Sequence, residues 1–313
     1  MRLSWDNRWI VPGLLLLVIV AIGLILPSSY YYRVGALVLI SALAVVGLNL
    51  LLGYAGQVSL GHAGFVGIGA YAVAVLPVHF NVPTPVALVL GALFSCLVAL
   101  AIGRPILRLR GHFLAVATLG FGVLVAMVLT NEIRWTGGPD GMTVKRLEIL
   151  GERIRTPQAW YWIAGFTLVI GITIAQNLLN SPTGRALRAL HDSEVAARVA
   201  GVDVARMKLT VFAISAVYAS VAGSYLALLN GHITPDSAGF LHSVELVTMV
   251  VLGGMGSLIG SVVGAAVLVI LPQALTLFHE YEHLMLGVFI ILIMVFLRDG
   301  IVPTLLQRLG RKP

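Results

Sequence analysis

Long apolar segments recur along the whole chain, and they restrict its fold more than any other feature. They lie at about 10–26, 34–52, 59–76, 85–103, 113–130, 160–179, 208–229, 241–254, 258–275 and 284–298. A helix that crosses a bilayer needs about 20 mostly apolar residues. Only 11% of the 313 residues are charged, about half the share of a soluble domain. We therefore predict an all-α polytopic membrane protein with about ten transmembrane helices, forming a single membrane domain over residues 1–313.

The net charge of +7 would also suit a nucleic-acid-binding protein, but its distribution argues against that function. Lys and Arg concentrate in short loops between apolar segments, where they act as topology signals. The basic stretches 103–112, 180–208 and 298–313 fall on one side if the N-terminus is cytoplasmic. We predict a multi-pass protein of the bacterial inner membrane with both termini in the cytoplasm and no nucleic-acid partner.

The N-terminal region has two interpretations. Arg2 and Arg8 precede the first apolar segment, as in a signal peptide. No small-x-small cleavage site follows, and another apolar segment begins at once, which favours an uncleaved first span. The single cysteine, Cys96, lies in an apolar segment and excludes a disulfide within the chain. No metal-binding or catalytic constellation is recognisable, so we expect a protein that is not an enzyme.

The longest predicted external loop, 131–158, begins with Gly-Gly and Pro-Asp-Gly at 137–141, which are turn sequences. Its Lys and Arg residues are balanced by acidic ones. Two interpretations stay open: an ordered external loop, or part of a docking surface for an extracytoplasmic partner.

Six glycines interrupt the chain between residues 53 and 69. Their spacing suits close helix packing, with 61, 64, 67 and 69 forming one smooth face. Polar side chains between them are costly at membrane depth unless they bond to one another or line a wet path, and broken helices near the midplane hold the sites of many transporters. An intramembrane acid is a further candidate, although it can also lie at the outer interface. The predicted substrate-path residues are Asn49, Tyr54, Gln57, Ser59, His62 and Glu245.

A second glycine-rich stretch, 253–260, echoes the stretch 53–61. Each joins two apolar segments on the predicted cytoplasmic side. Such an echo is typical of a fold built from an internal repeat.

The polar loop 181–208 carries the strongest functional signal. Ser181 and Pro182 predict the start of one short helix, and Asp192 or Ser193 the start of a second, which ends at Gly201. Basic amphipathic helices can lie on lipid headgroups. The alanines of the second helix favour close contact with a soluble partner instead.

Several motifs resemble the permeases of ATP-binding-cassette (ABC) importers. Glu194-x-Ala196-Ala197-x-x-x-Gly201 resembles their EAA loop, with a spacing that departs by one residue between Glu194 and the alanines. The stretches 49–65, 184–201 and 251–260 resemble the permeases for branched-chain amino acids, in particular the M-type of their two permease subunits. The resemblance covers about residues 34–298.

The resemblance implies a five-part importer that works by alternating access. Its partners would be a homologous second permease, two cytoplasmic ATPases and a periplasmic or lipid-anchored binding protein, with lipid around the spans. The chain has no Gly-x-x-x-x-Gly-Lys-Ser/Thr motif, so ATP and Mg²⁺ would be used by the ATPases and this chain would bind no cofactor. The expected ATPase-coupling residues are Arg185, Arg188, Asp192, Glu194, Ala196, Ala197 and Gly201.

Other solutes and mechanisms remain open at this point. Related permeases also carry other hydrophobic amino acids, urea or short amides. An ion-coupled secondary transporter is an alternative of another class, although such proteins place carboxylates or His pairs within their spans. A membrane-embedded enzyme would need a catalytic cluster.

Overall fold

Helices make up most of the chain that the computed structural model describes, which is residues 10–109, 111–149, 152–154, 156–275, 287, 291, 295, 297 and 299–308. The long helices are α1 (Ile10–Ile25), α2 (Ser29–Asn49), α3 (His62–His79), α4 (Thr84–Ile106), α5 (His112–Asn131), α7 (Pro157–Asn180), α10 (Val204–Asn230), α11 (Phe240–Gly253) and α12 (Leu258–Leu275). The shorter elements are the π-helical η1 (Leu50–Tyr54), α6 (Ile133–Thr136), η2 (Gly138–Asp140), α8 (Pro182–Asp192), α9 (Glu194–Val199), η3 (Pro235–Ala238) and α14 (Ile301–Arg308), with strands β1 (Met142–Thr143), β2 (Glu148–Ile149), β3 (Glu152–Arg153) and β4 (His232–Ile233).

Six helical stretches of the described residues are long and apolar enough to cross a bilayer: α2 with η1, α3, α4, α5, α7 and α10. The helices α1, α11 and α12 count as shorter apolar helices. The 14 residues of α11 rise about 21 Å, whereas the hydrocarbon core is about 30 Å thick. The all-α polytopic architecture is therefore confirmed, but the count of ten spans stays a prediction. The predicted segment 284–298 lies almost wholly outside the described residues.

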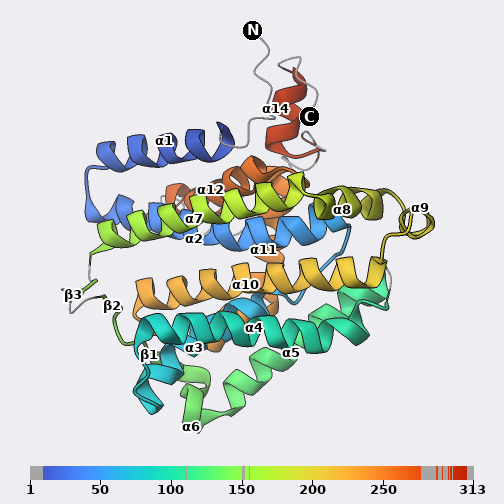
Figure 1. Cartoon of the computed structure of the whole chain (residues 1–313). Coiled ribbons are helices and arrows are strands. Elements are labelled where there is room, and N and C mark those ends of the chain that lie inside the picture. Colours follow the sequence, from blue (N-terminus) through green and yellow to red (C-terminus); the bar gives the residue numbers. More distant parts are fainter. Residues whose placement is uncertain are drawn as a thin grey trace.

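The long helices form stacked layers with α10 near the centre (Figure 1). One side of α10 packs on α3 and α4, and α2 lies on its other side, where it also contacts α7 and α12. Most of α2 and α10 is buried, whereas α4 and α5 expose large apolar side chains such as Leu97 and Leu124. The buried helices thus form the core, and α4 and α5 present a surface suited to lipid.

The short strands lie at one end of the long helices, and α8 and α9 lie at the other (Figure 1). At one end, β1 pairs antiparallel with β4, with Met142 opposite Ile233, and this pairing holds the described part of the predicted loop 131–158 against the end of α10. The described part of this loop is therefore ordered, while a docking role for it stays a prediction. At the other end, α8 and α9 project from α7.

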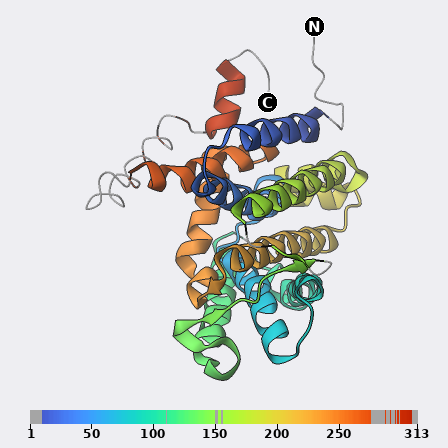
Figure 2. The same ribbon diagram turned by 90° about the vertical axis from the view of Figure 1, so that its left-hand side faces the viewer.

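The helix α11 runs steeply across the long helices (Figure 2) and packs on α12, α2 and α3. It ends at Gly254, whose φ of +115° is a conformation that favours glycine. The chain then turns sharply into α12, and α14 packs on this turn.

Glycines let α3 approach its neighbours closely, as expected, but they do not share one face. Gly61 and Gly64 face α5, Gly67 faces η3, and Gly69 faces the backbone of Ser220 in α10. Gly223 of α10 faces the Val66 backbone in return. The smooth-face prediction was wrong because three different elements surround the N-terminal half of α3.

Enlarging Gly223 should separate α3 from α10. A side chain there would overlap the Val66 carbonyl, and neither helix backbone can move aside without disrupting the core. We expect Gly223→Leu to destabilise the protein by about 3 kcal/mol, measured as a lower thermal unfolding temperature and a lower yield of monodisperse protein in detergent. Gly120→Leu is the matched control, since a side chain at Gly120 of α5 meets nothing within 4 Å. Equal effects of the two substitutions would contradict the packing described above.

Candidate functional site

The chain breaks between α2 and α3, and polar groups of neighbouring helices hold the break in place. After η1 the backbone turns at Gly56, whose φ is +64°. The Leu60 amide donates to Thr118 Oγ1 of α5 at 3.1 Å, and the Ala63 amide donates to Ser243 Oγ of α11 at 3.0 Å. The break is thus a built feature whose freed backbone groups find partners across helices.

Three predicted path residues in this break are buried and lack hydrogen-bond partners. Gln57 and Ser59 are each 2% exposed and His62 is fully buried. Among the described residues, neither polar atom of the Gln57 amide, nor Ser59 Oγ, nor either ring nitrogen of His62 makes a hydrogen bond. A buried polar group without a partner costs several kcal/mol in an apolar medium. Each of these buried groups therefore has hydrogen-bonding capacity that a polar ligand could use.

Further unpartnered polar atoms lie on the helices that flank the break. Ser215 and Ser220 of α10 and Tyr71 of α3 each bury an oxygen without a hydrogen bond. Sequence reasoning missed them, because a serine inside an apolar helix usually bonds to a carbonyl of its own helix, as Ser224 does with Ser220. Their lack of partners extends the candidate site along the α3–α10 interface.

Asn49, by contrast, has its amide fully engaged in a structural contact. Its Nδ2 donates to the Ser257 carbonyl at 2.9 Å and to Ser261 Oγ at 2.8 Å, and its Oδ1 accepts from the Gly256 amide at 2.9 Å. These bonds join the end of α2 to the turn between α11 and α12. Asn49 thus has a structural role, and its place in the substrate path stays a prediction. The two glycine-rich stretches do meet, with Gly53 packed against Gly256.

Glu245 does not lie with the buried group either. Its side chain is 62% exposed on α11, and its Oε2 is 3.1 Å from His242 Nδ1 of the same helix. The exposed face of α11 carries Glu245 toward the surroundings of the chain, and its assignment to the substrate path stays a prediction. Its neighbour Ser243 faces the break instead.

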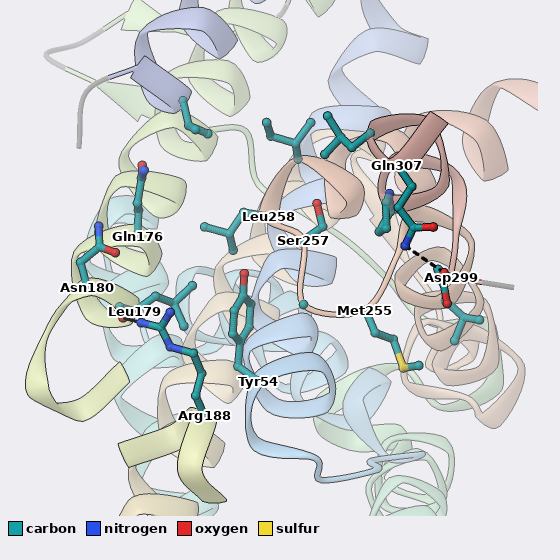
Figure 3. A pocket seen from close by; sticks show the side chains of 16 residues that line it. Tyr54, Gln176, Leu179, Asn180, Arg188, Met255, Ser257, Leu258, Asp299 and Gln307 are labelled. Atoms are coloured by element: carbon teal, nitrogen blue, oxygen red, sulfur yellow. Dashed lines mark hydrogen bonds between the residues drawn. The ribbon is translucent and has the colours of Figure 1, made fainter. Parts of the chain in front are cut away.

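Tyr54 ends η1 at the edge of a separate cavity of about 630 Å³ (Figure 3). The cavity lies where η1, α7 and α8 meet the α11–α12 turn and α14. The predicted path set is thus divided among four places: the buried break, the Asn49 contact, the surface of α11 and this cavity.

The loop 181–208 folds as its sequence predicts. Ser181 Oγ caps α8 by accepting from the Gly184 amide, and Ser193 Oγ caps α9 by accepting from the Ala196 amide. Gly201, at φ +81°, follows the end of α9. Two short capped helices are confirmed here because their signals are local.

The expected coupling residues of this loop separate into inward-facing and outward-facing ones. Arg188 donates from Nη2 to the Leu179 carbonyl at 2.7 Å, which ties α8 to the end of α7. Glu194 forms an ion pair with the buried Lys208 of α10, and Ala197 is buried. The exposed members are Arg185, Arg188, Asp192, Ala196 and Gly201.

Val195 and Val199 are exposed on α9, one helical turn apart. Val195 is 70% exposed and Val199 is 85% exposed, whereas Leu187 and Leu190 of α8 are buried in the chain. An apolar pair presented on a short, firmly anchored helix suits a groove on a partner protein.

The C-terminal end of α8 also lies against the break between α2 and α3. A side chain at Gly56 would lie 3.5 Å from the His191 ring, and α8 packs on η1. The loop that presents α9 therefore touches the segment that carries Gln57 and Ser59.

Comparisons with known proteins show the family of the chain. Residues 30–296 match the family described as the permease component of branched-chain amino acid transport systems. The high-affinity branched-chain amino acid transport system permease protein LivM of Salmonella typhimurium is 33% identical, with 95% of this chain and 76% of that protein covered. LivM of Escherichia coli is 34% identical, with 86% and 69% covered. LivH of Escherichia coli, a permease protein of the same type of system, is 27% identical over 83% of this chain and 90% of that protein. No solved structure matches the chain.

Removing the Asn49 amide should weaken the contact between the two breaks. Asn49→Ala leaves the Gly256 amide and the Ser257 carbonyl without this partner, and each buried unsatisfied group costs about 1–3 kcal/mol. We expect a clearly lower thermal unfolding temperature in detergent. The control is Asn131→Ala, because the exposed Asn131 amide bonds only to Met127 of its own helix. If both variants unfolded like the unmodified protein, the structural role of Asn49 would be disproved.

Proposed function

Because the chain belongs to the family of permease components of branched-chain amino acid transport systems, we propose that it is one membrane subunit of an ABC importer for branched-chain amino acids. Its relatives include both LivM and LivH permease proteins, which supports a pair of homologous permeases, this chain being the M-type member. The chain is a multi-pass membrane protein, and we place it in the bacterial inner membrane.

The observation that carries the proposal is the group of unpartnered buried polar atoms in the break at Gln57, Ser59 and His62. We propose that this break borders the translocation path. A zwitterionic amino acid needs donors and acceptors as it leaves water, and these side chains have both to spare. Weak binding suffices in the permease if a separate binding protein supplies the affinity.

The α9 helix is proposed to dock on a cytoplasmic ATPase through Val195 and Val199. The ion pair between Glu194 and Lys208 and the contact of Arg188 with Leu179 fix the direction in which these valines point. Arg185, Asp192 and Ala196 lie on the exposed surface around them and would contact the partner at its rim.

In the proposed alternating-access mechanism, ATP binding moves α9, and α8 passes the movement to the break. His191 contacts the break at Gly56, so α8 needs no further element to reach it. ATP and Mg²⁺ are bound and used by the partner ATPases, and this chain is the transport subunit without enzymatic activity of its own.

The proposed orientation places α8, α9 and both termini in the cytoplasm. The chain at that end includes Arg108, the helix residues Arg104, Arg185 and Arg198, and Arg206 at the start of α10, in accord with the positive-inside rule. The opposite end, with α6, β1 and β4, then faces outward, where a periplasmic or lipid-anchored binding protein would dock.

Substitutions in the break should impair transport without unfolding the protein. We expect Gln57→Ala combined with Ser59→Ala to lower ATP-dependent leucine uptake about tenfold in proteoliposomes that contain the whole transporter. Neither side chain donates or accepts a hydrogen bond that holds the fold, so assembly should stay normal. The control is Thr173→Val, whose hydroxyl bonds only to Val169 of its own helix. Unchanged uptake in a normally assembled variant would remove this path assignment, and uptake driven by an ion gradient without ATPases would refute the importer itself.

Charged residues on the free face of α9 should uncouple the ATPase. Val195→Asp with Val199→Asp puts two charges where the proposed apolar contact forms, and we expect loss of ATPase co-purification while the second permease is retained. Ala205→Asp adds the same type of charge at an exposed position just beyond α9 and should have little effect. Retention of the ATPase in the double variant would contradict the proposed docking face.

A further inference from the structure

The cavity beside Tyr54 has polar groups on two opposite walls and apolar side chains between them (Figure 3). Tyr54, Gln176 and Arg188, from η1, α7 and α8, lie on one side. Asp299 and Gln307, which precede and belong to α14, lie on the other. The apolar lining includes Leu179, Met255, Leu258 and Leu306.

The two charges in this cavity are not neutralised by the described part of the chain. Arg188 donates only to the carbonyl oxygens of Leu179 and Gly184, and within the described ranges no carboxylate forms an ion pair with it. Asp299 accepts from Gln307 Nε2 at 3.2 Å, and no described cation forms an ion pair with it. Both residues are exposed, so each leaves a charge, one positive and one negative, that a ligand in the cavity can meet.

Two uncharged groups also have hydrogen-bonding capacity to spare. Gln176 Oε1 is buried without a partner in the part of the chain that the structure describes. The Tyr54 hydroxyl reaches the same cavity (Figure 3). These groups add one acceptor and one donor beside Arg188.

Two candidate membrane spans end at this cavity, which places it where lipid headgroups are expected. The membrane span Ser29–Tyr54 ends at Tyr54, and the span Pro157–Asn180 ends beside Gln176 and Leu179. Val11, at the start of α1, borders the cavity as well. Tyrosine is favoured at the membrane–water interface, and basic pockets between helices at this level bind lipid headgroups.

We propose that this cavity binds a phospholipid whose headgroup carries a primary ammonium, that is, a phosphatidylethanolamine. Arg188 and the Tyr54 hydroxyl would hold the phosphate, Asp299 would accept from the ammonium, and the apolar lining would receive the first carbons of the acyl chains. The assignment to the cytoplasmic leaflet rests on the proposed orientation, whereas the binding itself does not.

The charges of the cavity select among ligands. An anionic headgroup would satisfy Arg188 but be repelled by Asp299, and a choline headgroup has no N–H to donate to a carboxylate. A free α-amino acid carries the same two charges, so displacement by free leucine is what separates it from a lipid headgroup as the ligand. A headgroup with its phosphate and ammonium at separate positions fits this arrangement.

A lipid in this place would touch the elements that the transport proposal uses. The cavity is bordered by Tyr54 at the end of the break, by Arg188 of α8, and by Met255 and Ser257 of the turn that Asn49 holds. Membrane composition would thereby influence how firmly these elements are held together.

The test is lipid retention by the whole transporter, measured by native mass spectrometry after incubation with equimolar phosphatidylethanolamine, phosphatidylcholine and phosphatidylglycerol. We expect about tenfold preference for phosphatidylethanolamine over phosphatidylglycerol at one site. Asp299→Lys should reverse this preference, because the cavity then carries two cations. Asp299→Asn should reduce the preference over phosphatidylcholine. Glu132→Gln, at the opposite end of the molecule, is the matched control and should leave all ratios unchanged.

Arg188→Gln gives a second, independent measurement and should lower retention of all three phospholipids. A thermal unfolding temperature close to that of the unmodified transporter verifies that each variant folds. Equal retention of the three lipids, ratios that Asp299→Lys leaves unchanged, or displacement of the lipid by free leucine would each overturn the proposal. Because no transport is measured, these results are independent of the importer assignment.

Discussion

The interior of a bilayer offers no water to polar groups, and the rest of this structure depends on that constraint. A continuous helix satisfies its own backbone, so every interruption needs side chains from elsewhere. Thr118 and Ser243 accept hydrogen bonds from backbone amides at the break before α3. Asn49 Oδ1 accepts one from the Gly256 amide in the turn before α12. These interruptions have hydrogen-bond partners for their backbone groups. The side-chain atoms of Gln57, Ser59 and His62 have none, and this difference is the reason for assigning them to the candidate site.

The structure also depends on close approach of helix backbones, because in lipid the hydrophobic effect does not drive helices together. Contact must come from packing, and small residues allow it. Gly69 and Gly223 let α3 and α10 meet backbone to backbone, and Gly53 lets the two breaks touch. Gly184 does the same where α8 folds back on the end of α7. The polar contacts form only because these glycines bring their donors and acceptors within reach.

The sequence predicts local features of this structure well and long-range partners poorly. The caps at Ser181 and Ser193 were predictable because a cap involves residues three positions apart. The engagement of Asn49 with Ser257 and Ser261 was not, because those partners lie far along the chain. The sequence left two positions open for Glu245, within the membrane or at the outer interface, and the structure shows it on an exposed face of a short helix. Ser215 and Ser220 gave no signal, since unpartnered and partnered serines look alike in a sequence.

The same packing determines how a movement at α9 must travel under the proposed mechanism. Glu194 pairs with Lys208, which is buried at the start of α10, so a displacement of α9 acts on α10 directly. Between Gly69 and Ser220 the contact of α3 with α10 is backbone against backbone, with no flexible side chain to absorb the displacement. The α8 helix meanwhile touches the break at Gly56. A shift of α9 therefore reaches the segment 56–62 from both sides: through α8 at its beginning, and through α10 and α3 at its end. Residues 56–61 form no regular helix, so this segment is a place where the structure can yield.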